Sequence, residues 1–339
     1  MTPSAISPLP TSPEDTTLAT LRTTLLSESS PLASRFRALF SLKHLASTTL
    51  TPTSPSQTPA LTAITKCLTT SSSALLKHEV AYCLGQTRNL AAVPTLQAVL
   101  RDLREDAMVR HEAAEALGAL GDRGSLELLG EFRDRVGEEG VVRETCEIAV
   151  ERIRWELEKR GEEVNVRKSD FASIDPAPPL PQDDKITPTI PELEKVLLDT
   201  NLPLFHRYRS MFALRDLASP PTLPTATPAV LSLAKGFADP SPLFRHEIAF
   251  VFGQLSHPAS IPSLVAALGN QNEMAMVRHE AAEALGSLGE EEGVEDVLKG
   301  FLEDPVEVVR ESVVVALDMA EYERSGEVEY ALVPEGIAV

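Results

Sequence analysis

Cysteine, long apolar runs and positive charge are all scarce in this sequence. The three cysteines, Cys67, Cys83 and Cys146, are odd in number and widely spaced, so no disulfide framework or cysteine-based zinc site is implied and a reducing compartment is favoured. No apolar stretch is long enough to span a bilayer, and residues 1–17 lack the basic segment and apolar core of a secretory signal. We therefore expect a cytoplasmic protein without a membrane partner, and the nucleus is a second candidate location.

Basic residues are outnumbered by acidic ones. The chain of 339 residues has 31 lysines and arginines against 50 aspartates and glutamates, which gives a formal net charge of −19. Because proteins bind nucleic-acid phosphates with lysine and arginine, we expect no nucleic-acid partner. The balance suits a cationic ligand or a basic protein partner, and the plainer alternative is an ordinary solvated surface.

Strand-like alternation of apolar and polar residues is nearly absent as well, and helical repeats take its place. The segment EAAEALGALGDRGSLELL, residues 112–129, recurs nearly unchanged as EAAEALGSLGEEEGVEDVL, residues 280–298. Its alanines and leucines follow helical spacing, glycines end the helix, and the repeat period is about 33 residues. This period is typical of a solenoid of helical hairpins, so the predicted fold class is all-α.

The hairpins form two related halves. Each unit resembles the short HEAT-like repeat, whose second helix opens with a turn such as DPVEVVRE at residues 304–311. The first units also match, as RFRALFSLKHLAS at 35–47 and RYRSMFALRDLAS at 207–219, so both halves descend from one block of four hairpins. The predicted hairpins lie near residues 15–47, 59–88, 91–122, 124–160, 190–219, 226–256, 260–290 and 293–323. The predicted divisions are a disordered tail (1–16), an N-terminal lobe (17–160), an extended interlobe linker (161–189), a C-terminal lobe (190–323) and a C-terminal tail (324–339), with a low-complexity insert at 47–59.

Four His-Glu dipeptides follow the same symmetry. They stand 33 residues apart within each half and 168 residues apart between the halves. Imidazole and carboxylate are ligands of first-row transition metals, and stacked hairpins place equivalent residues on one inner surface. Two facing lobes would therefore share a two-metal site, with two imidazoles and a carboxylate for each metal, a set that suits non-haem iron. The candidate ligands are His78, Glu79, His111, Glu112, His246, Glu247, His279 and Glu280.

The register of the four pairs carries this prediction. A single pair would more often be a solvent-facing helix start, but neither repeat architecture nor helix capping requires histidine at four matched positions. Other polar residues receive plainer interpretations: Glu115 and Glu283 lie on a helix face or support the ligands, Gln86 and Gln254 cap helices, and His44, His206 and His257, which lack symmetry mates, are packing or surface residues.

The blocks around the pairs carry a family resemblance. They read KHEVAYCLGQ at 77–86, RHEIAFVFGQL at 245–255, and VRHEAAEALG at both 109–118 and 277–286. With these blocks the sequence resembles the deoxyhypusine hydroxylases, the HEAT-repeat di-iron monooxygenases of eukaryotes. The resemblance covers nearly the whole chain from Thr17 to Glu323, apart from the linker and the insert.

The resemblance implies a ligand set, a reaction and partners. It implies two Fe²⁺ ions, O₂ as co-substrate, an external electron donor and no catalytic residue beyond the metal ligands. The implied reaction hydroxylates the deoxyhypusine side chain of translation initiation factor 5A to hypusine. The sequence leaves the oligomeric state open, and we expect a monomer because a two-lobed pseudo-dimer can be complete by itself. By the same resemblance, one iron is held by His78, His111 and Glu112, the second by His246, His279 and Glu280, and the substrate amine by Glu79 and Glu247.

Two other functions remain open from the residues alone. A metal-free HEAT scaffold that binds proteins on its curved surface would tolerate replacement of all four histidines. A two-metal hydrolase with zinc or manganese would act without oxygen.

Overall fold

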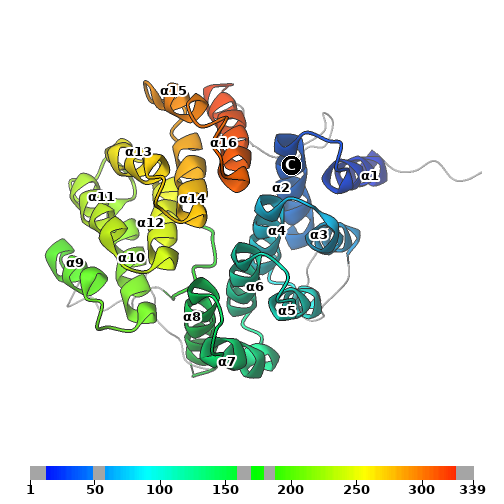
Figure 1. Cartoon of the computed structure of the whole chain (residues 1–339), viewed down its shortest axis with the longest axis horizontal. Helices are drawn as coiled ribbons and strands as arrows, with labels where there is room; N and C mark the ends of the chain where they lie inside the picture. Colours follow the sequence, from blue (N-terminus) through cyan, green and yellow to red (C-terminus); the bar gives the residue numbers. More distant parts are fainter. Residues whose placement is uncertain (1–12, 49–57, 159–168, 179–187, 326–339) are drawn as a thin grey trace, which may run out of the picture.

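The computed structural model describes residues 13–48, 58–158, 169–178 and 188–325, and every regular element in these ranges is a helix (Figure 1). The α-helices are α1 (Pro13–Leu26), α2 (Leu32–Thr48), α3 (Pro59–Thr70), α4 (Ala74–Gln86), α5 (Val93–Arg101), α6 (Ala107–Ala119), α7 (Leu126–Asp134), α8 (Gly140–Glu158), α9 (Ile190–Leu198), α10 (Leu204–Ala218), α11 (Ala226–Ala234), α12 (Pro242–Leu255), α13 (Ile261–Gly269), α14 (Ala275–Gly286), α15 (Val294–Lys299) and α16 (Glu307–Ser325). Four short 3₁₀ helices, η1 (Leu90–Ala92), η2 (Arg123–Ser125), η3 (Lys235–Ala238) and η4 (Pro258–Ser260), lie between them. The predicted all-α solenoid is confirmed. Within the described ranges, no helix is both long and apolar enough to cross a membrane.

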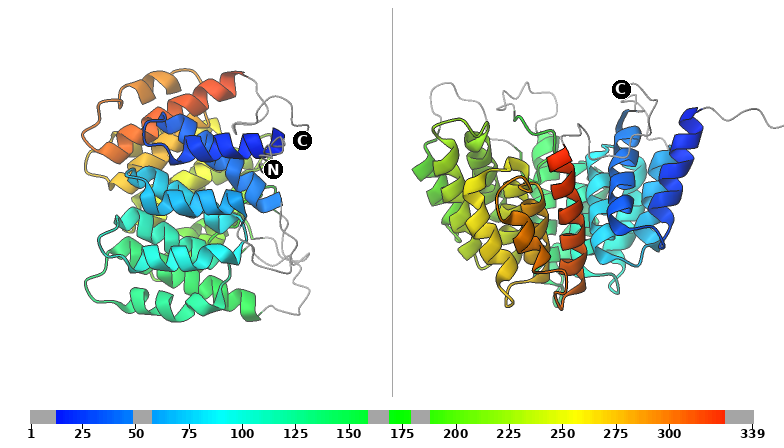
Figure 2. Two further views of the ribbon diagram at one scale, coloured as in Figure 1. Left: turned by 90° about the vertical axis from the view of Figure 1, so that its right-hand side faces the viewer. Right: turned by 90° about the horizontal axis from the view of Figure 1, so that it is seen from above.

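The helices pair into hairpins that stack around a common centre. Figure 1 shows the even-numbered helices, which are the second helices of their hairpins, on the inside and the odd-numbered helices on the outside, and Figure 2 shows the stack from the side and from above. Helix α8 contacts α10 and α12, and α16 contacts α2 and α4. The last hairpin of each lobe therefore lies against the beginning of the other lobe, and the two lobes close into a ring.

Small residues let neighbouring inner helices approach closely. A Cβ atom added to Gly118 of α6 would lie 2.9 Å from the Cβ atom of Ala149 in α8, and one added to Gly286 of α14 would lie 2.8 Å from the Cα atom of Ala316 in α16. Neither glycine has room for a side chain, so the glycine and alanine positions of the repeat set the spacing of the inner layer.

A repeated arginine fixes the register of four inner helices, α2, α6, α10 and α14. The Nε atoms of Arg35, Arg110, Arg207 and Arg278 each donate to the carbonyl oxygen ten residues earlier, at distances of 3.0, 3.3, 3.0 and 2.9 Å. The residue that follows this arginine occupies an equivalent place in every unit that has the bond. It is aromatic in the first units (Phe36 and Tyr208) and histidine in the third units (His111 and His279).

Polar contacts join the two lobes at both seams, which are the places where α8 meets α10 and α12 and where α16 meets α2 and α4. Ser73, the N-cap residue of α4, donates to Glu311 of α16 at 2.8 Å, and its symmetry mate Ser241 donates to Glu144 of α8 at 2.6 Å. At one seam a bidentate ion pair of Arg37 with Asp318, at 2.8 and 2.9 Å, adds to this contact. The fourth hairpins, which lack His-Glu pairs, thus use their glutamates to hold the opposite lobe.

The helices differ from the predicted divisions at two ends. Helix α1 begins at Pro13, inside the predicted tail of residues 1–16, because proline suits the first turn of a helix. Helix α16 ends at Ser325, two residues into the predicted C-terminal tail. Most of the predicted tails, residues 49–57 of the insert and residues 161–168 and 179–187 of the linker lie outside the described residues.

Candidate metal centre

The structure brings the four imidazoles of the His-Glu pairs together at the centre of the ring. The ring centroid of His78 lies 5.3 Å from that of His111, 5.7 Å from that of His246 and 5.1 Å from that of His279. His246 is 5.5 Å from His111 and 5.4 Å from His279 by the same measure. All four side chains are buried, and they come from α4, α6, α12 and α14, so each lobe contributes two.

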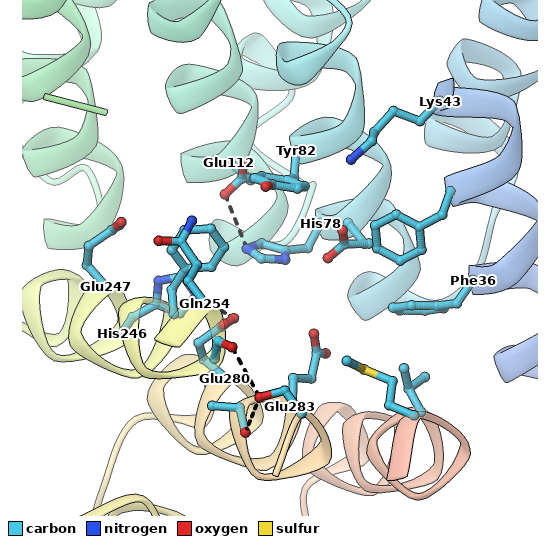
Figure 3. Close-up of a pocket in the computed structure, with 18 of the residues that line it drawn as sticks. Phe36, Lys43, His78, Tyr82, Glu112, His246, Glu247, Gln254, Glu280 and Glu283 are labelled. Atoms are coloured by element: carbon cyan, nitrogen blue, oxygen red, sulfur yellow. Dashed lines mark hydrogen bonds and ion pairs between the residues drawn. The ribbon is translucent and has the colours of Figure 1, made fainter. Parts of the chain in front are cut away.

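The glutamates of the third hairpins reach the histidines of the second hairpins. Glu112 Oε2 lies 3.3 Å from His78 Nε2, and Glu280 Oε2 lies 3.4 Å from His246 Nε2 (Figure 3). These contacts repeat in both lobes. A carboxylate and an imidazole that converge from neighbouring hairpins can bind one cation between them, as the symmetry of the sequence predicts.

The buried ring nitrogens have no hydrogen-bond partner. This holds for both nitrogens of His78, His111, His246 and His279, and for one carboxylate oxygen of Glu247. Each unsatisfied buried polar group costs about 1–3 kcal/mol, so eight such nitrogens in one place need a compensating interaction. Bound cations provide that interaction, and the residues present therefore fit a metal centre.

Among the described residues, three groups of ligand atoms lie close enough to hold an ion. Within each group the atoms are within 4.8 Å of one another. One of the groups is the set predicted for the second iron. In the N-terminal lobe the predicted set is divided, because His78 and His111 group with a histidine of the other lobe and Glu112 groups with Glu115. The groups are His246 with His279 and Glu280; His78 with His111 and His246; and His111 with Glu112 and Glu115.

Burial sets the charge state of the centre. It lowers the pKa of His78 and lowers the pKa values of His111 and His279 still further, so these imidazoles are neutral, which is the form that binds metal. Burial raises the pKa of Glu79 to about 7 and that of Glu112 to about 8. Nearby carboxylates contribute to both increases. A cation placed among these groups would restore the charged form of the carboxylates.

Metal loading should stabilise the protein against heat. We expect Fe²⁺ added without oxygen to raise the melting temperature, because a ligand at one hundred times its dissociation constant contributes about 2.7 kcal/mol. Differential scanning calorimetry of metal-free and loaded protein measures the shift. Mg²⁺ is the control, since it prefers oxygen ligands and waters. An equal shift with both ions would contradict an imidazole-rich site.

A cavity of about 460 Å³ adjoins the imidazoles. Six glutamates contribute to its wall, together with aromatic and apolar side chains of α2, α4, α12 and α16 (Figure 3). Such a lining suits an elongated ligand with an aliphatic chain and positive charge. The lining residues used below are the glutamates Glu79, Glu112, Glu115, Glu247, Glu280 and Glu283, with Phe36, Phe40, Lys43, His44, Tyr82, Phe250, Met319 and Tyr322.

Some secondary interpretations of the sequence need correction. Gln86 and Gln254 do not act only at helix ends, because both bind the linker through side-chain hydrogen bonds. His44 is exposed but lines the cavity. By contrast, the position of Glu283 agrees with its interpretation as a residue that supports the ligands, because it lies at the cavity wall with its Oε1 atom 3.6 Å from His279 Nδ1.

Two aromatic residues of the cavity wall were missed. Tyr82 and Phe250 each follow a histidine by four residues, and their ring centroids are 5.8 Å apart across the lobes. They are mates under the 168-residue symmetry, and residues four apart share one face of a helix. That combination could have identified them from the sequence.

The repeat structure is also found by comparison with known families. HEAT repeats match residues 58–151 and 227–318. Fold and site together define a class: a two-lobed HEAT-repeat protein with buried imidazoles and carboxylates that could hold metal ions beside an acidic cavity.

Named relatives resemble the chain over nearly its whole length. The deoxyhypusine hydroxylase of Phaeosphaeria nodorum is 66% identical over 96% of this chain and 98% of its own, and that of Neurospora crassa is 63% identical over 94% and 97%. The solved structure of human deoxyhypusine hydroxylase in complex with glycerol matches with a TM-score of 0.78 and 42% identity, over 90% of this chain and 96% of that one. The chain belongs to the deoxyhypusine hydroxylase family, as the His-Glu blocks predicted.

Proposed function

We propose that this protein is a deoxyhypusine monooxygenase that converts the deoxyhypusine side chain of translation initiation factor 5A to hypusine. The proposal includes two Fe²⁺ ions, O₂, an external electron donor and a monomeric enzyme. The observation that carries it is the cluster of four buried imidazoles without hydrogen-bond partners beside an acidic cavity. The names of the relatives support the substrate.

The target of the reaction explains the need for metal. The side chain carries an unactivated aliphatic C–H bond, and ordinary acid–base groups do not break such a bond. When bound, the iron pair supplies oxygen activation and electron transfer. Overall, one oxygen atom of O₂ enters the C–H bond, and the other leaves as water with two electrons from the donor and two protons.

The ligand assignment follows the symmetry of the chain. Each lobe would hold one ion through two imidazoles and the glutamate of its third hairpin. In the N-terminal lobe, the 3.3 Å approach of Glu112 to His78 supports this assignment, and in the C-terminal lobe the group of His246, His279 and Glu280 supports it. The first ion would be held by His78, His111 and Glu112, and the second by His246, His279 and Glu280.

The remaining glutamates would hold the cationic side chain. Glu79 is half-buried and Glu247 is buried, and both line the cavity next to the histidines. Burial raises the pKa of Glu79 to about 7 and raises that of Glu247 well above its ordinary value. An ammonium group beside these two carboxyl groups would favour their charged forms. The electrostatic attraction between the glutamates and the substrate therefore becomes strong only when the substrate is bound.

The test is an assay with isotopically labelled O₂. Iron-loaded protein, a reductant and the deoxyhypusine-containing factor should yield a factor heavier by one labelled oxygen atom, measured by mass spectrometry. No product should form without oxygen. Oxygen-independent turnover with zinc or manganese would favour the hydrolase instead, and a protein that binds no metal would favour the scaffold.

Glu247→Gln should separate substrate binding from metal binding. We expect unchanged iron content and substrate binding weaker by roughly tenfold to a hundredfold, because a hydrogen bond to a charged group is worth about 1.5–3 kcal/mol. Calorimetric titration with a deoxyhypusine peptide measures the affinity. The matched control is Glu290→Gln at an exposed position. Loss of iron from Glu247→Gln would make Glu247 a metal ligand instead.

A further inference from the structure

The two lobes should give the central cavity two equivalent mouths. One mouth lies between α2 and α16, and its symmetry mate lies between α10 and α8. When the matching segments of these helices are aligned, three positions at the mouths are equivalent in the two lobes. Lys43 is equivalent to Arg215, His44 to Asp216 and Met319 to Arg152. These residue pairs differ in chemistry, although the surrounding helices are alike.

A segment of the linker fills the mouth between α8 and α10. Asp175 accepts hydrogen bonds from both terminal nitrogens of Arg215, at 2.7 and 2.8 Å, and its carbonyl oxygen accepts one from Arg152 at 2.5 Å. Ser169 donates to Asp216 at 3.0 Å, and the guanidinium of Arg215 lies 4.5 Å from the ring centroid of Phe171. The linker is therefore held by Arg152, Arg215 and Asp216, the three residues whose symmetry mates lie at the mouth between α2 and α16.

The same segment crosses the ring toward the centre. The side chain of Gln86 in α4 donates to the carbonyl oxygen of Ile174 at 3.3 Å and accepts from its N–H at 2.8 Å. Gln254 of α12 donates to Ser173 at 2.9 Å. Pro176 lines a space against α6 and α8 that leaves no room for a water molecule. The described part of the linker, residues 169–178, thus closes this half of the cavity.

The described residues place no linker segment across the other mouth. Lys43, His44 and Met319 all line the cavity of about 460 Å³, together with Phe40 and Tyr322. Among the described lining residues, Lys43 is the sole lysine or arginine, and its Nζ atom lies 5.3 and 5.8 Å from the ring centroids of Phe40 and Tyr82. A fixed positive charge here disfavours an ammonium group at the mouth relative to a position deeper among the glutamates.

We propose that residues 169–178 seal one of two pseudo-equivalent mouths, and that the cationic side chain of the protein substrate enters through the mouth between α2 and α16. This inference rests on the proposed function. A two-fold symmetric centre alone would accept the side chain from either direction. With one mouth closed, the substrate side chain can enter from one direction only, and it therefore presents the same carbon atom to the metals each time.

Met319→Trp tests the open mouth. Met319 is half-buried at the cavity wall, so the indole should obstruct the entrance and weaken binding of a deoxyhypusine peptide by roughly tenfold or more, as overpacking of an existing contact does. Iron content should not change. The matched control is Ala172→Trp, at an exposed position on the sealing segment, which should bind as the unmodified protein does. Equal affinity of both variants would overturn the proposal.

Thiol labelling gives a second readout without turnover. The native cysteines Cys67, Cys83 and Cys146 are fully buried, so background labelling with a maleimide should be low. Bound peptide should protect the thiol of the His44→Cys variant and leave that of the Ala172→Cys variant reactive. Protection only at position 172, or at neither position with peptide bound, would overturn the proposal. If the unmodified iron-loaded protein binds no peptide, the proposed function fails and this inference fails with it.

Discussion

His111→Ala should remove at least half of the iron bound by the chain and abolish hydroxylation. His111 is completely buried, and neither of its ring nitrogens has a hydrogen-bond partner. Its ring lies 5.3 Å from His78 and 5.5 Å from His246, so it belongs to the centre of the cluster. Loss of a residue that merely orients a ligand lowers metal affinity about 10–100-fold, and loss of the ligand itself should cost more. Elemental analysis after anaerobic loading measures the effect.

His257→Ala is the matched control for this experiment. The side chain of His257 accepts a hydrogen bond from the N–H of Ala259 at 3.1 Å and caps η4. Its loss should cost about 1 kcal/mol of stability without changing the iron content. Equal iron content in both variants would contradict the assignment of the metal centre. Circular dichroism establishes that both variants retain their helices.

The repeat period was sufficient to predict the hairpins and the convergence of the ligands. Each His-Glu pair lies on the inner helix of its hairpin, and equivalent residues of stacked hairpins share one surface. The position of His111 along its own unit therefore determined where its side chain would lie. The same argument places Glu115 and Glu283 on the cavity wall, since they follow their histidines by one helical turn.

Contacts between distant segments could not be predicted in this way. Gln86 and Ile174 are 88 residues apart, and no periodic pattern connects a helix to an irregular linker. In the described residues 169–178, the composition of the linker correctly indicated a segment without regular helix, but it did not indicate the partners of that segment. The glutamates of the fourth hairpins are a similar case. The sequence shows that the fourth hairpins lack the His-Glu pair. It does not show the contacts of Glu144 with Ser241 and of Glu311 with Ser73, because these form only when the two lobes close into a ring.

Arg215→Ala should be among the most destabilising single substitutions in the chain. The guanidinium is buried, it pairs with Asp175 at 2.7 Å and with Asp216 at 3.1 Å, and it donates to Gln254 at 2.9 Å. Truncation leaves two carboxylates without their partner in a buried place and opens a void beside Phe171. Removing one member of a buried ion pair costs about 3–5 kcal/mol. The midpoint of urea unfolding should fall accordingly.

Arg104→Ala isolates the contribution of burial. Arg104 also makes two hydrogen bonds to one aspartate, Asp102, each at 3.0 Å, but its side chain is 90% exposed. An exposed pair contributes about 0–1 kcal/mol, because water screens the charges and both side chains lose freedom. Both arginines therefore make two hydrogen bonds to one aspartate, but Arg215 is buried and has further partners, whereas Arg104 is exposed. If both variants unfold at the same urea concentration, the linker does not hold the lobes together through Arg215, and its contacts there are incidental to folding.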